Sequence, residues 1–379
     1  MRLCSLSECS TDLRYRANMS NGKIKVLIPQ LPTADAILPY LRRIDEKRTY
    51  SNYGPLATEF RDRLSALTGA AGATLTSNGT TAIEVVLRIR ARPGARYCLM
   101  PSYTFIASAH AVCNAGLTPY LLDVSEQTLT LTPELARAAL RELDEQPAAV
   151  LVVSAFGAPP DQAAWQAFEE ETGVPVVFDA AAATTSIKSV GRQPLCVSLH
   201  ATKALGIGEG GAILCSDKEL IERASAITGF GFLGAERVSA IRAGNYRISE
   251  YAGAVGLAVL DALPERLAEL QRLTDGYRAR LDSGKRSRLQ EHVGENWLTM
   301  TLNVILPTDS VTQTISRLDE EQVEWRRWWG FGCHKHPAFA DLPRGDLTTT
   351  ESISHRVIGL PFHNLLSDVD LDRIVRCLP

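Results

Sequence analysis

Residues 198–211 read SLHATKALGIGEGG, which places a lysine at position 203 ahead of four glycines. Lysine forms Schiff bases with carbonyl compounds, and neighbouring glycines let the backbone approach a bulky ring. Taken alone, a lysine before a glycine-rich turn is more often a solvated surface residue. Other parts of the sequence must therefore show whether Lys203 binds a ligand or is a surface residue.

On both sides of this stretch, short apolar runs alternate with longer mixed segments. The runs before it are TLTSN (74–78), YCLMP (97–101), PYLLDV (119–124), AAVLVVSAF (148–156) and VPVVFDA (174–180). Such alternation is typical of a mainly parallel β-sheet covered by helices on both faces. The sequence therefore predicts an α/β fold.

The length of 379 residues indicates two domains, because single cores stop growing near roughly 250 to 300 residues. The stretch 249–283 has a helical pattern with a break at Pro264, and could connect two lobes. Beyond it, an expected strand over 297–306 and a helix over 368–378 indicate a smaller α+β lobe. We expect a tail (1–27), a large domain (28–262) and a small domain (263–379).

Composition excludes several partners. A net charge of −3 without a long basic run gives no reason to expect nucleic acid or an anionic membrane. The apolar runs fall short of the roughly 20 residues of a membrane helix, and the N-terminus lacks the apolar core of a secretory signal. The eight cysteines match neither a disulfide scaffold nor paired CxxC metal spacing, and Cys4 and Cys9 are interpreted as surface thiols. We expect no metal and a cytoplasmic location.

Two polar groups follow predicted strands, at the edge where α/β sheets bind ligands. In the segment 77–81 (SNGTT), a helix start with hydroxyl side chains could bind a phosphate, although an ordinary helix cap explains it about as well. Asp179 ends a run that is expected to be buried. Its carboxylate could pair with a protonated pyridine nitrogen, or it could cap the next helix.

Two further residues support a planar, phosphorylated ligand. Phe105 follows the run 97–101 and could lie against a planar ring, although core packing is the commoner fate of a phenylalanine. Ser198, at the start of the lysine segment, could add a hydroxyl to a phosphate site.

Taken together, these motifs resemble the DegT/DnrJ/EryC1/StrS family of sugar aminotransferases, from about Pro32 to the C-terminus. The stretches that carry the resemblance are SNGTTAI (77–83), PSYTFIASAHAV (101–112), DAAAA (179–183), SLHATKALGIGEGG (198–211), AGNYRISEYAGAVGL (243–257), RRWWGFGCHKHPAF (326–339) and GLPFH (359–363). The resemblance implies pyridoxal 5′-phosphate (PLP) fold type I, with a mostly parallel seven-stranded type of sheet and a smaller C-terminal domain.

The resemblance also implies residue roles. Lys203 would hold PLP and move protons during catalysis, and Asp179 would keep the pyridine nitrogen protonated. Phe105 would stack on the ring. The phosphate would be bound by Gly79, Thr80, Thr81 and Ser198. Asn245 would reach the phosphate of a neighbouring subunit, which implies a homodimer with shared active sites.

Some positions leave alternatives open. The family usually has Gln or His where this chain has Ala182, and His200 or a water could occupy that space. Arg327 and His334 resemble a substrate-contacting segment, but could equally be a surface arginine and a buried, hydrogen-bonded histidine. Arg247 could contact a substrate phosphate or pair with Glu250 on a helix.

By this resemblance, the chain is expected to move an amino group from L-glutamate to the keto group of a nucleotide-linked deoxy sugar. One alternative is a specialised PLP enzyme that acts on a non-sugar keto or amino substrate, which Ala182 could mark. Another is a non-catalytic dimeric binding protein. Retention of Lys203 and Asp179 argues against it, because buried charges without a ligand are costly.

Overall fold

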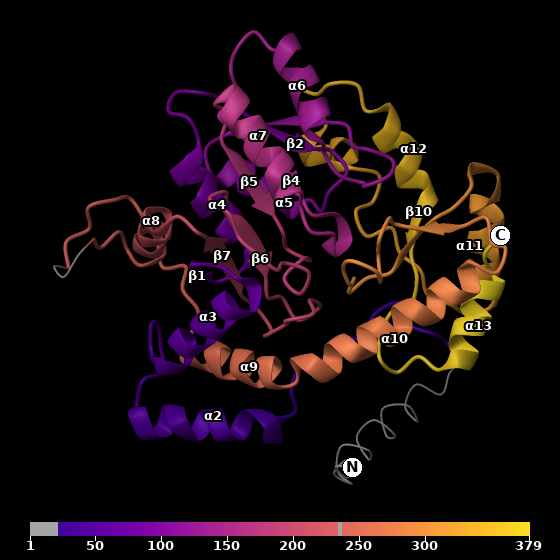
Figure 1. The fold of residues 1–379 in the computed structure, drawn as a ribbon, viewed down its shortest axis with the longest axis horizontal. Helices are drawn as coiled ribbons and strands as arrows, with labels where there is room; N and C mark the ends of the chain where they lie inside the picture. Colours follow the sequence, from indigo (N-terminus) through magenta and orange to yellow (C-terminus); the bar gives the residue numbers. More distant parts are fainter. Residues whose placement is uncertain (1–21, 234–236) are drawn as a thin grey trace.

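The computed structural model describes residues 22–233 and 237–379, and its largest element is a seven-stranded sheet (Figure 1). The strand order is β1-β7-β6-β5-β4-β2-β3, and β7 alone runs antiparallel to its neighbours within this sheet. The strands are β1 (Gly72–Thr76), β2 (Tyr97–Pro101), β3 (Thr118–Leu122), β4 (Ala149–Val153), β5 (Val176–Asp179), β6 (Leu195–Ser198) and β7 (Gly211–Cys215). The α/β prediction is confirmed.

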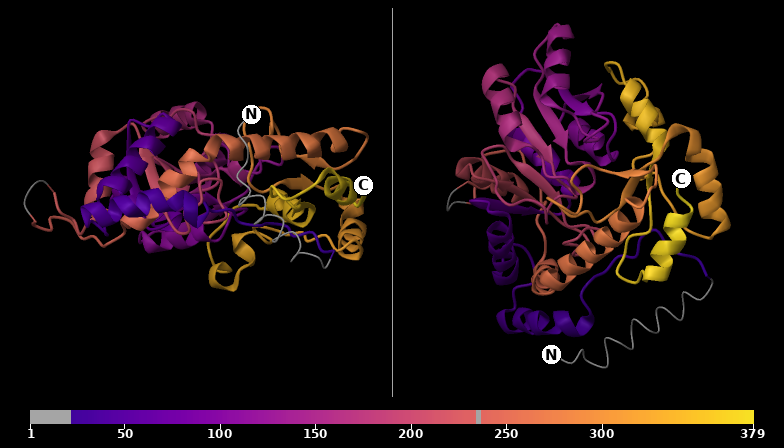
Figure 2. Two further views of the ribbon diagram at one scale, coloured as in Figure 1. Left: turned by 90° about the horizontal axis from the view of Figure 1, so that it is seen from below. Right: turned by 45° about the vertical axis from the view of Figure 1, so that its right-hand side comes forward.

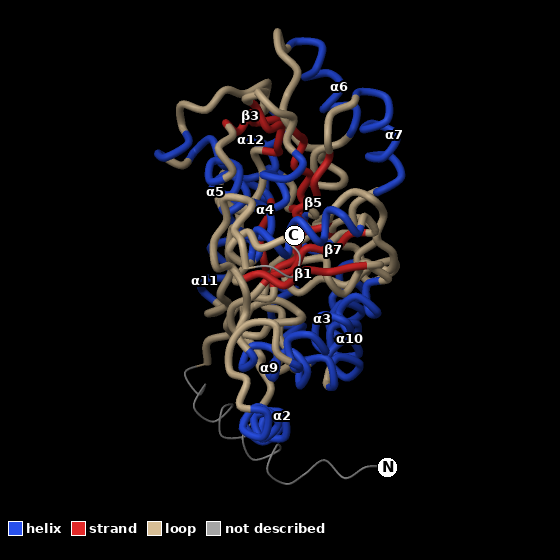
Figure 3. Tube along the Cα trace, turned by 90° about the vertical axis from the view of Figure 1, so that its left-hand side faces the viewer, coloured by secondary structure: helices blue, strands red, loops and turns tan. Residues whose placement is uncertain are grey.

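Helices cover both faces of this sheet (Figure 3). One face packs against α4 (Gly79–Arg90), α5 (Ala107–Asn114) and α8 (Lys218–Thr228). The other packs against α3 (Pro55–Thr68), α6 (Pro133–Glu142), α7 (Gln162–Thr172) and α9 (Glu250–Asp261), and α2 (Ala34–Lys47) lies on α9. Strands buried on both faces explain why the apolar runs are continuous in the sequence.

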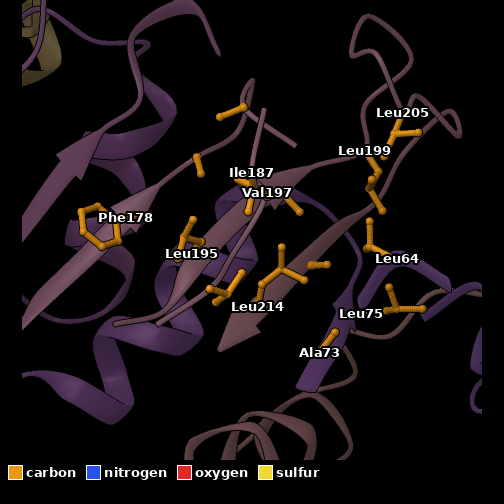
Figure 4. Close-up of a cluster of buried hydrophobic side chains, with 14 of the residues drawn as sticks. Leu64, Ala73, Leu75, Phe178, Ile187, Leu195, Val197, Leu199, Leu205 and Leu214 are labelled. Carbon is orange, nitrogen blue, oxygen red and sulfur yellow. The ribbon is translucent and has the colours of Figure 1, made fainter. Parts of the chain in front are cut away.

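The core alternates between the two faces of the sheet, as strand geometry requires. Phe178, Leu195, Val197 and Leu214 point to the face that carries α3, α7 and α9, and Figure 4 shows them in one cluster that also contains Leu64. Their strand neighbours Val177, Cys196 and Ile213 belong to the cluster on the opposite face. Burial of side chains on this scale is the main stabilising contribution to the fold.

A long helix, α10 (Leu263–Leu281), leads from α9 to the C-terminal part of the chain (Figure 2). Pro264 lies in its first turn, where a missing N–H costs nothing, so the predicted helix break is confirmed. The second sheet is antiparallel, in the order β10-β9-β8. Its strands are β8 (Arg288–Leu289), β9 (Asn303–Ile305) and β10 (Val357–Gly359). The same part of the chain contains the helices α11 (Val311–Glu320), α12 (Thr348–Arg356) and α13 (Asp368–Arg376).

Element boundaries differ from the predictions in detail. The strand expected over 297–306 is confined to 303–305, because only these residues pair with the neighbouring strands β10 and β8. The domain boundaries stay a prediction. Ile24, within the expected tail, forms an isolated bridge to Val323, while Cys4 and Cys9 lie outside the described residues. No helix in the described part of the chain is long and apolar enough to cross a membrane.

Candidate active site

A cavity of about 360 Å³ opens at the carboxyl ends of β4, β5 and β6. This is the edge of an α/β sheet where ligands are expected. Its lining includes Leu27, Asn78, Gly79, Thr80, Thr104, Phe105, Ser154, Phe156, Asp179, Ala182, Ser198, His200, Thr202, Lys203, Glu209, Met300, Trp328 and Trp329. The structure thus brings together six of the predicted site residues: Gly79, Thr80, Phe105, Asp179, Ser198 and Lys203.

The N-terminus of α4 faces this cavity. Asn78 caps the helix by accepting a hydrogen bond from the Thr81 N–H at 2.8 Å. Thr81 is therefore engaged in the cap, whereas Gly79 and Thr80 begin the helix, where N–H groups have no intrahelical partner. A side chain on Gly79 would meet the Ser198 Cβ at 3.0 Å, so the helix start and the Ser198 hydroxyl lie together. Backbone N–H groups, the helix dipole and a hydroxyl form a site for an anion such as phosphate.

The last glycine of the GEGG segment, Gly211, explains how the helix approaches so closely. A Cβ on Gly211 would lie 2.5 Å from the Asn78 carbonyl carbon. Gly211 pairs with Thr76 of β1 and Ser198 of β6, so it sits in the strand between them. A glycine there allows the turn before α4 to pack onto β7.

Asp179 ends β5 and is 6% exposed. Its carboxylate accepts a hydrogen bond from the Ser108 hydroxyl at 2.7 Å and another from the Ala181 N–H at 3.1 Å. Burial raises the pKa of Asp179, and these two bonds and the charge of Lys203 oppose that shift. A cationic group in the cavity would favour the ionised form further.

Lys203 is held at the cavity by its backbone. Its N–H donates to the His200 carbonyl at 2.8 Å, and its carbonyl accepts from Arg266 at 3.2 Å. Burial lowers the pKa of the Lys203 amine, and Asp179 opposes this shift. A lysine with a lowered pKa has more neutral, nucleophilic amine near pH 7 than a surface lysine. The alternative of a solvated surface residue does not describe it.

Aromatic residues that the sequence analysis missed form one wall of the cavity. Phe156 and Trp329 stack with ring centroids 4.0 Å apart, and Tyr103 packs edge-on against Trp329. Phe105 also lines the cavity but is 57% exposed, so it is not packed into the core. The paired tryptophans in RRWWGFGCH were the available signal for this wall, because large aromatic side chains commonly line ligand pockets.

Asn245 and Arg247 lie outside the cavity lining. The Asn245 side-chain oxygen accepts from the Arg247 guanidinium at 3.0 Å. That guanidinium also lies over the rings of Tyr53 and Phe230. The alternative pairing of Arg247 with Glu250 is wrong, because the Glu250 carboxylate is buried and caps α3 instead.

Arg327 and His334 also lie outside the lining of this cavity. Arg327 donates to the His355 carbonyl at 3.0 Å and lies over the rings of Trp325 and Phe331. The His334 ring nitrogen Nδ1 lies 2.8 Å from the Ser102 hydroxyl, and burial lowers the pKa of this histidine. The structure thus places His334 as a buried, hydrogen-bonded residue next to β2.

The cavity residues suit a small molecule that carries a phosphate, a protonated ring nitrogen and a carbonyl group. The start of α4 with Ser198 offers an anion site, Asp179 offers a buried carboxylate, and Lys203 offers an amine. Gly79 and Ser198 lie so close together that a side chain at position 79 would not fit, and a phosphate can therefore approach the backbone there. PLP has this set of groups, so the residues present fit it.

Comparisons with known proteins agree with this chemistry. The model of the DegT/DnrJ/EryC1/StrS aminotransferase family matches residues 33–379. Protein Rv3402c of Mycobacterium tuberculosis is 30% identical over 370 residues, covering 93% of this chain and 89% of that protein. The dTDP-4-amino-4,6-dideoxy-D-glucose transaminase of Shigella dysenteriae is 25% identical, with 93% and 97% covered. The crystal structure of a candidate PLP-dependent aminotransferase from Bacillus cereus has a TM-score of 0.88 at 28% identity, covering 94% of this chain and 99% of that one.

Proposed function

The chain belongs to the DegT/DnrJ/EryC1/StrS aminotransferase family, and on this premise we propose that it moves an amino group from L-glutamate to the keto group of a nucleotide-linked deoxy sugar. Its cofactor is PLP. The observation that carries the proposal is that Lys203 and Asp179 line the same cavity as the N-terminus of α4. An amine, a carboxylate and a helix N-terminus that suits an anion therefore line one cavity.

Each of these residues has a distinct part in the reaction. When bound, the cofactor supplies an electron-withdrawing ring that stabilises negative charge on the substrate carbon. Lys203 binds the cofactor, and its amine then takes and returns the proton at the substrate carbon. The lowered pKa of Lys203 suits a base that works near pH 7. Asp179 would keep a positive charge on the ring nitrogen. Gly79, Thr80 and Ser198, together with the hydroxyl of Thr81, would hold the phosphate.

A nucleotide-linked sugar as acceptor is supported by the Shigella relative, whose name specifies a dTDP-linked amino sugar. Phe105 is proposed to lie on the cofactor ring, while the apolar wall of Phe156 and Trp329 suits a sugar face that lacks a hydroxyl. Arg247, Arg327 and His334 remain proposed contacts for the substrate. Guanidinium groups match the oxygens of a diphosphate with two parallel hydrogen bonds.

We also propose a homodimer in which Asn245 reaches the phosphate site of its partner. Asn245 lies outside the cavity of its own chain, which fits a role in a second copy. It follows a segment with exposed apolar side chains, namely Phe230, Phe232, Leu233 and Val238. Patches of this kind commonly mark protein interfaces. A cytoplasmic location is proposed as well, since the six cysteines in the described part of the chain are free thiols.

The proposed function is tested in two steps, first with the amino-group donor and then with the keto acceptor. Purified holoenzyme is mixed with L-glutamate, and loss of the visible cofactor band is measured together with release of 2-oxoglutarate. A dTDP-4-keto-6-deoxy sugar is then added, and the amino sugar is detected by mass spectrometry, with a keto cyclitol as the comparison acceptor. Amination of the dTDP sugar supports the proposal. Amination of the cyclitol alone favours the specialised enzyme, which the proposal excludes.

A further inference from the structure

Ser154 directly follows β4 and lines the cavity, yet its hydroxyl has no hydrogen-bond partner among the described residues. The residue is 5% exposed. A buried hydroxyl without a partner costs about 1–3 kcal/mol, so most such groups are satisfied in native proteins. An unpaired hydroxyl at the wall of a ligand cavity indicates that the ligand supplies the partner.

The strand order fixes where Ser154 stands relative to the other site residues. Strands β6, β5 and β4 are neighbours in that order. Ser198 ends β6, Asp179 ends β5, and Ser154 follows β4, with its N–H donating to the Asp179 carbonyl at 2.8 Å. The three side chains therefore form a row along the carboxyl edge of the sheet, with Asp179 in the middle.

The polar groups around the PLP ring can be matched to the row formed by Ser198, Asp179 and Ser154. On the pyridine ring, the carbon that bears the phosphate arm and the carbon that bears the phenolic oxygen lie on opposite sides of the nitrogen. The aldehyde carbon lies across the ring from the nitrogen. If Ser198 marks the phosphate, Asp179 the nitrogen and Lys203 the aldehyde, the phenolic edge faces the end of β4. We propose that Ser154 donates a hydrogen bond to the phenolic oxygen of bound PLP.

Three other residues considered for this edge, Ala182, His200 and Ser108, are either apolar or already paired. Ala182, at the position where the family usually has Gln or His, has no polar side chain. His200 is engaged elsewhere, with its Nδ1 2.9 Å from the Thr202 hydroxyl and its Nε2 3.7 Å from Glu209. The Ser108 hydroxyl is bound to Asp179. Ser154 thus takes the place of the side chain that is missing at position 182.

The inference rests on the cofactor assignment, and a pH titration of the holoenzyme tests it. A donor to the phenolic oxygen stabilises its negative charge and so weakens its hold on the proton of the lysine linkage. Ser154→Ala should therefore raise the midpoint pH of the visible absorbance change by about 0.5–1 unit. It should also speed loss of cofactor on dilution about 3- to 10-fold.

Ser287→Ala is the matched control. Ser287 is also 5% exposed with an unpaired hydroxyl, but it lies outside the cavity lining. Its variant should titrate and retain cofactor like the unaltered protein. If Ser154→Ala does the same, the inference is overturned while the transaminase proposal stands. If the unaltered protein shows no visible band with PLP, the cofactor assignment fails, and this inference fails with it.

Discussion

The Ser108 hydroxyl donates a 2.7 Å hydrogen bond to the Asp179 carboxylate, and this contact joins α5 to the end of β5 at the floor of the cavity. Both residues are buried. The bond lowers the pKa of Asp179, against the larger effect of burial. Ser108 therefore orients the carboxylate and favours the ionised form that a protonated ring nitrogen needs.

Removal of this bond should weaken cofactor binding. A hydrogen bond to a charged group contributes about 1.5–3 kcal/mol, so Ser108→Ala should raise the Kd for PLP roughly tenfold or more. Fluorescence titration of the apoprotein with PLP measures this. Ser354→Ala is the control, because Ser354 is buried and its hydroxyl donates to the Glu351 carbonyl. Equal affinities in the two variants would contradict the role of Ser108.

The contribution of Asp179 to the stability of the apoprotein should fall as pH rises above about 4. Burial raises the pKa of Asp179 above its ordinary value of 3.8, so the folded chain binds this proton more tightly than the unfolded chain does. The resulting contribution to the free energy of unfolding is present at low pH and is lost as pH rises through the raised pKa.

Asp179→Asn should remove this loss. The Ser108 hydroxyl can accept as well as donate, so both hydrogen bonds of the side chain can persist without its charge. At pH 7 the apo variant should be more stable to unfolding than the unaltered protein, while its affinity for PLP falls. Urea unfolding at pH 4, 5.5 and 7 measures the difference. If the free energy of unfolding changes with pH in the same way in the variant and in the unaltered protein, the pKa of Asp179 is not raised.

Gly211→Ala should destabilise the fold and the phosphate site together. The added Cβ would lie 2.5 Å from the Asn78 backbone, which has no freedom to move aside without shifting the start of α4. Overpacking of this kind costs about 1–3 kcal/mol, and the melting temperature should fall. Gly345→Ala is the control, because its Cβ would have an ordinary 3.7 Å contact with Leu122. Similar melting temperatures for both variants would show that the contact at Gly211 relaxes freely.

Mixed dimers test whether the active site is shared. Lys203→Ala and Asn245→Ala should each lose most activity, but mixed subunits should regain about a quarter to a half of it, because one site then combines an intact Lys203 with an intact Asn245. Mixing Lys203→Ala with Asp179→Asn is the control. Those residues serve the same subunit, so both sites stay damaged. If neither mixture regains activity, Asn245 acts in the active site of its own subunit or in no active site.

Much of the fold could be predicted because its signals are local. Continuous apolar runs indicated buried parallel strands, and Pro264 indicated where one helix ends and the next begins. Asp179 ends β5 and Lys203 lies in the loop after β6, so the carboxyl edge of the sheet brings them to one cavity.

Relationships between distant segments could not be predicted in this way. Ser108 meets Asp179 because α5 packs on the sheet in one register, which no local pattern specifies. The pairing of Arg247 with Glu250 failed for the same reason. Glu250 turns to the N-terminus of α3, 194 residues earlier in the sequence, where free N–H groups bind its carboxylate and leave it unavailable to Arg247.

Attachment of the cofactor to Lys203 underlies every role proposed above, and chemical reduction of the bound cofactor reveals which lysine carries it. Protein saturated with PLP is reduced with borohydride, digested and mapped by mass spectrometry, with Lys203→Ala treated in parallel. We expect a pyridoxyl adduct on the peptide that contains Lys203, together with a visible band that Lys203→Ala lacks. An adduct on another lysine, or no adduct with the band unchanged in Lys203→Ala, would contradict it.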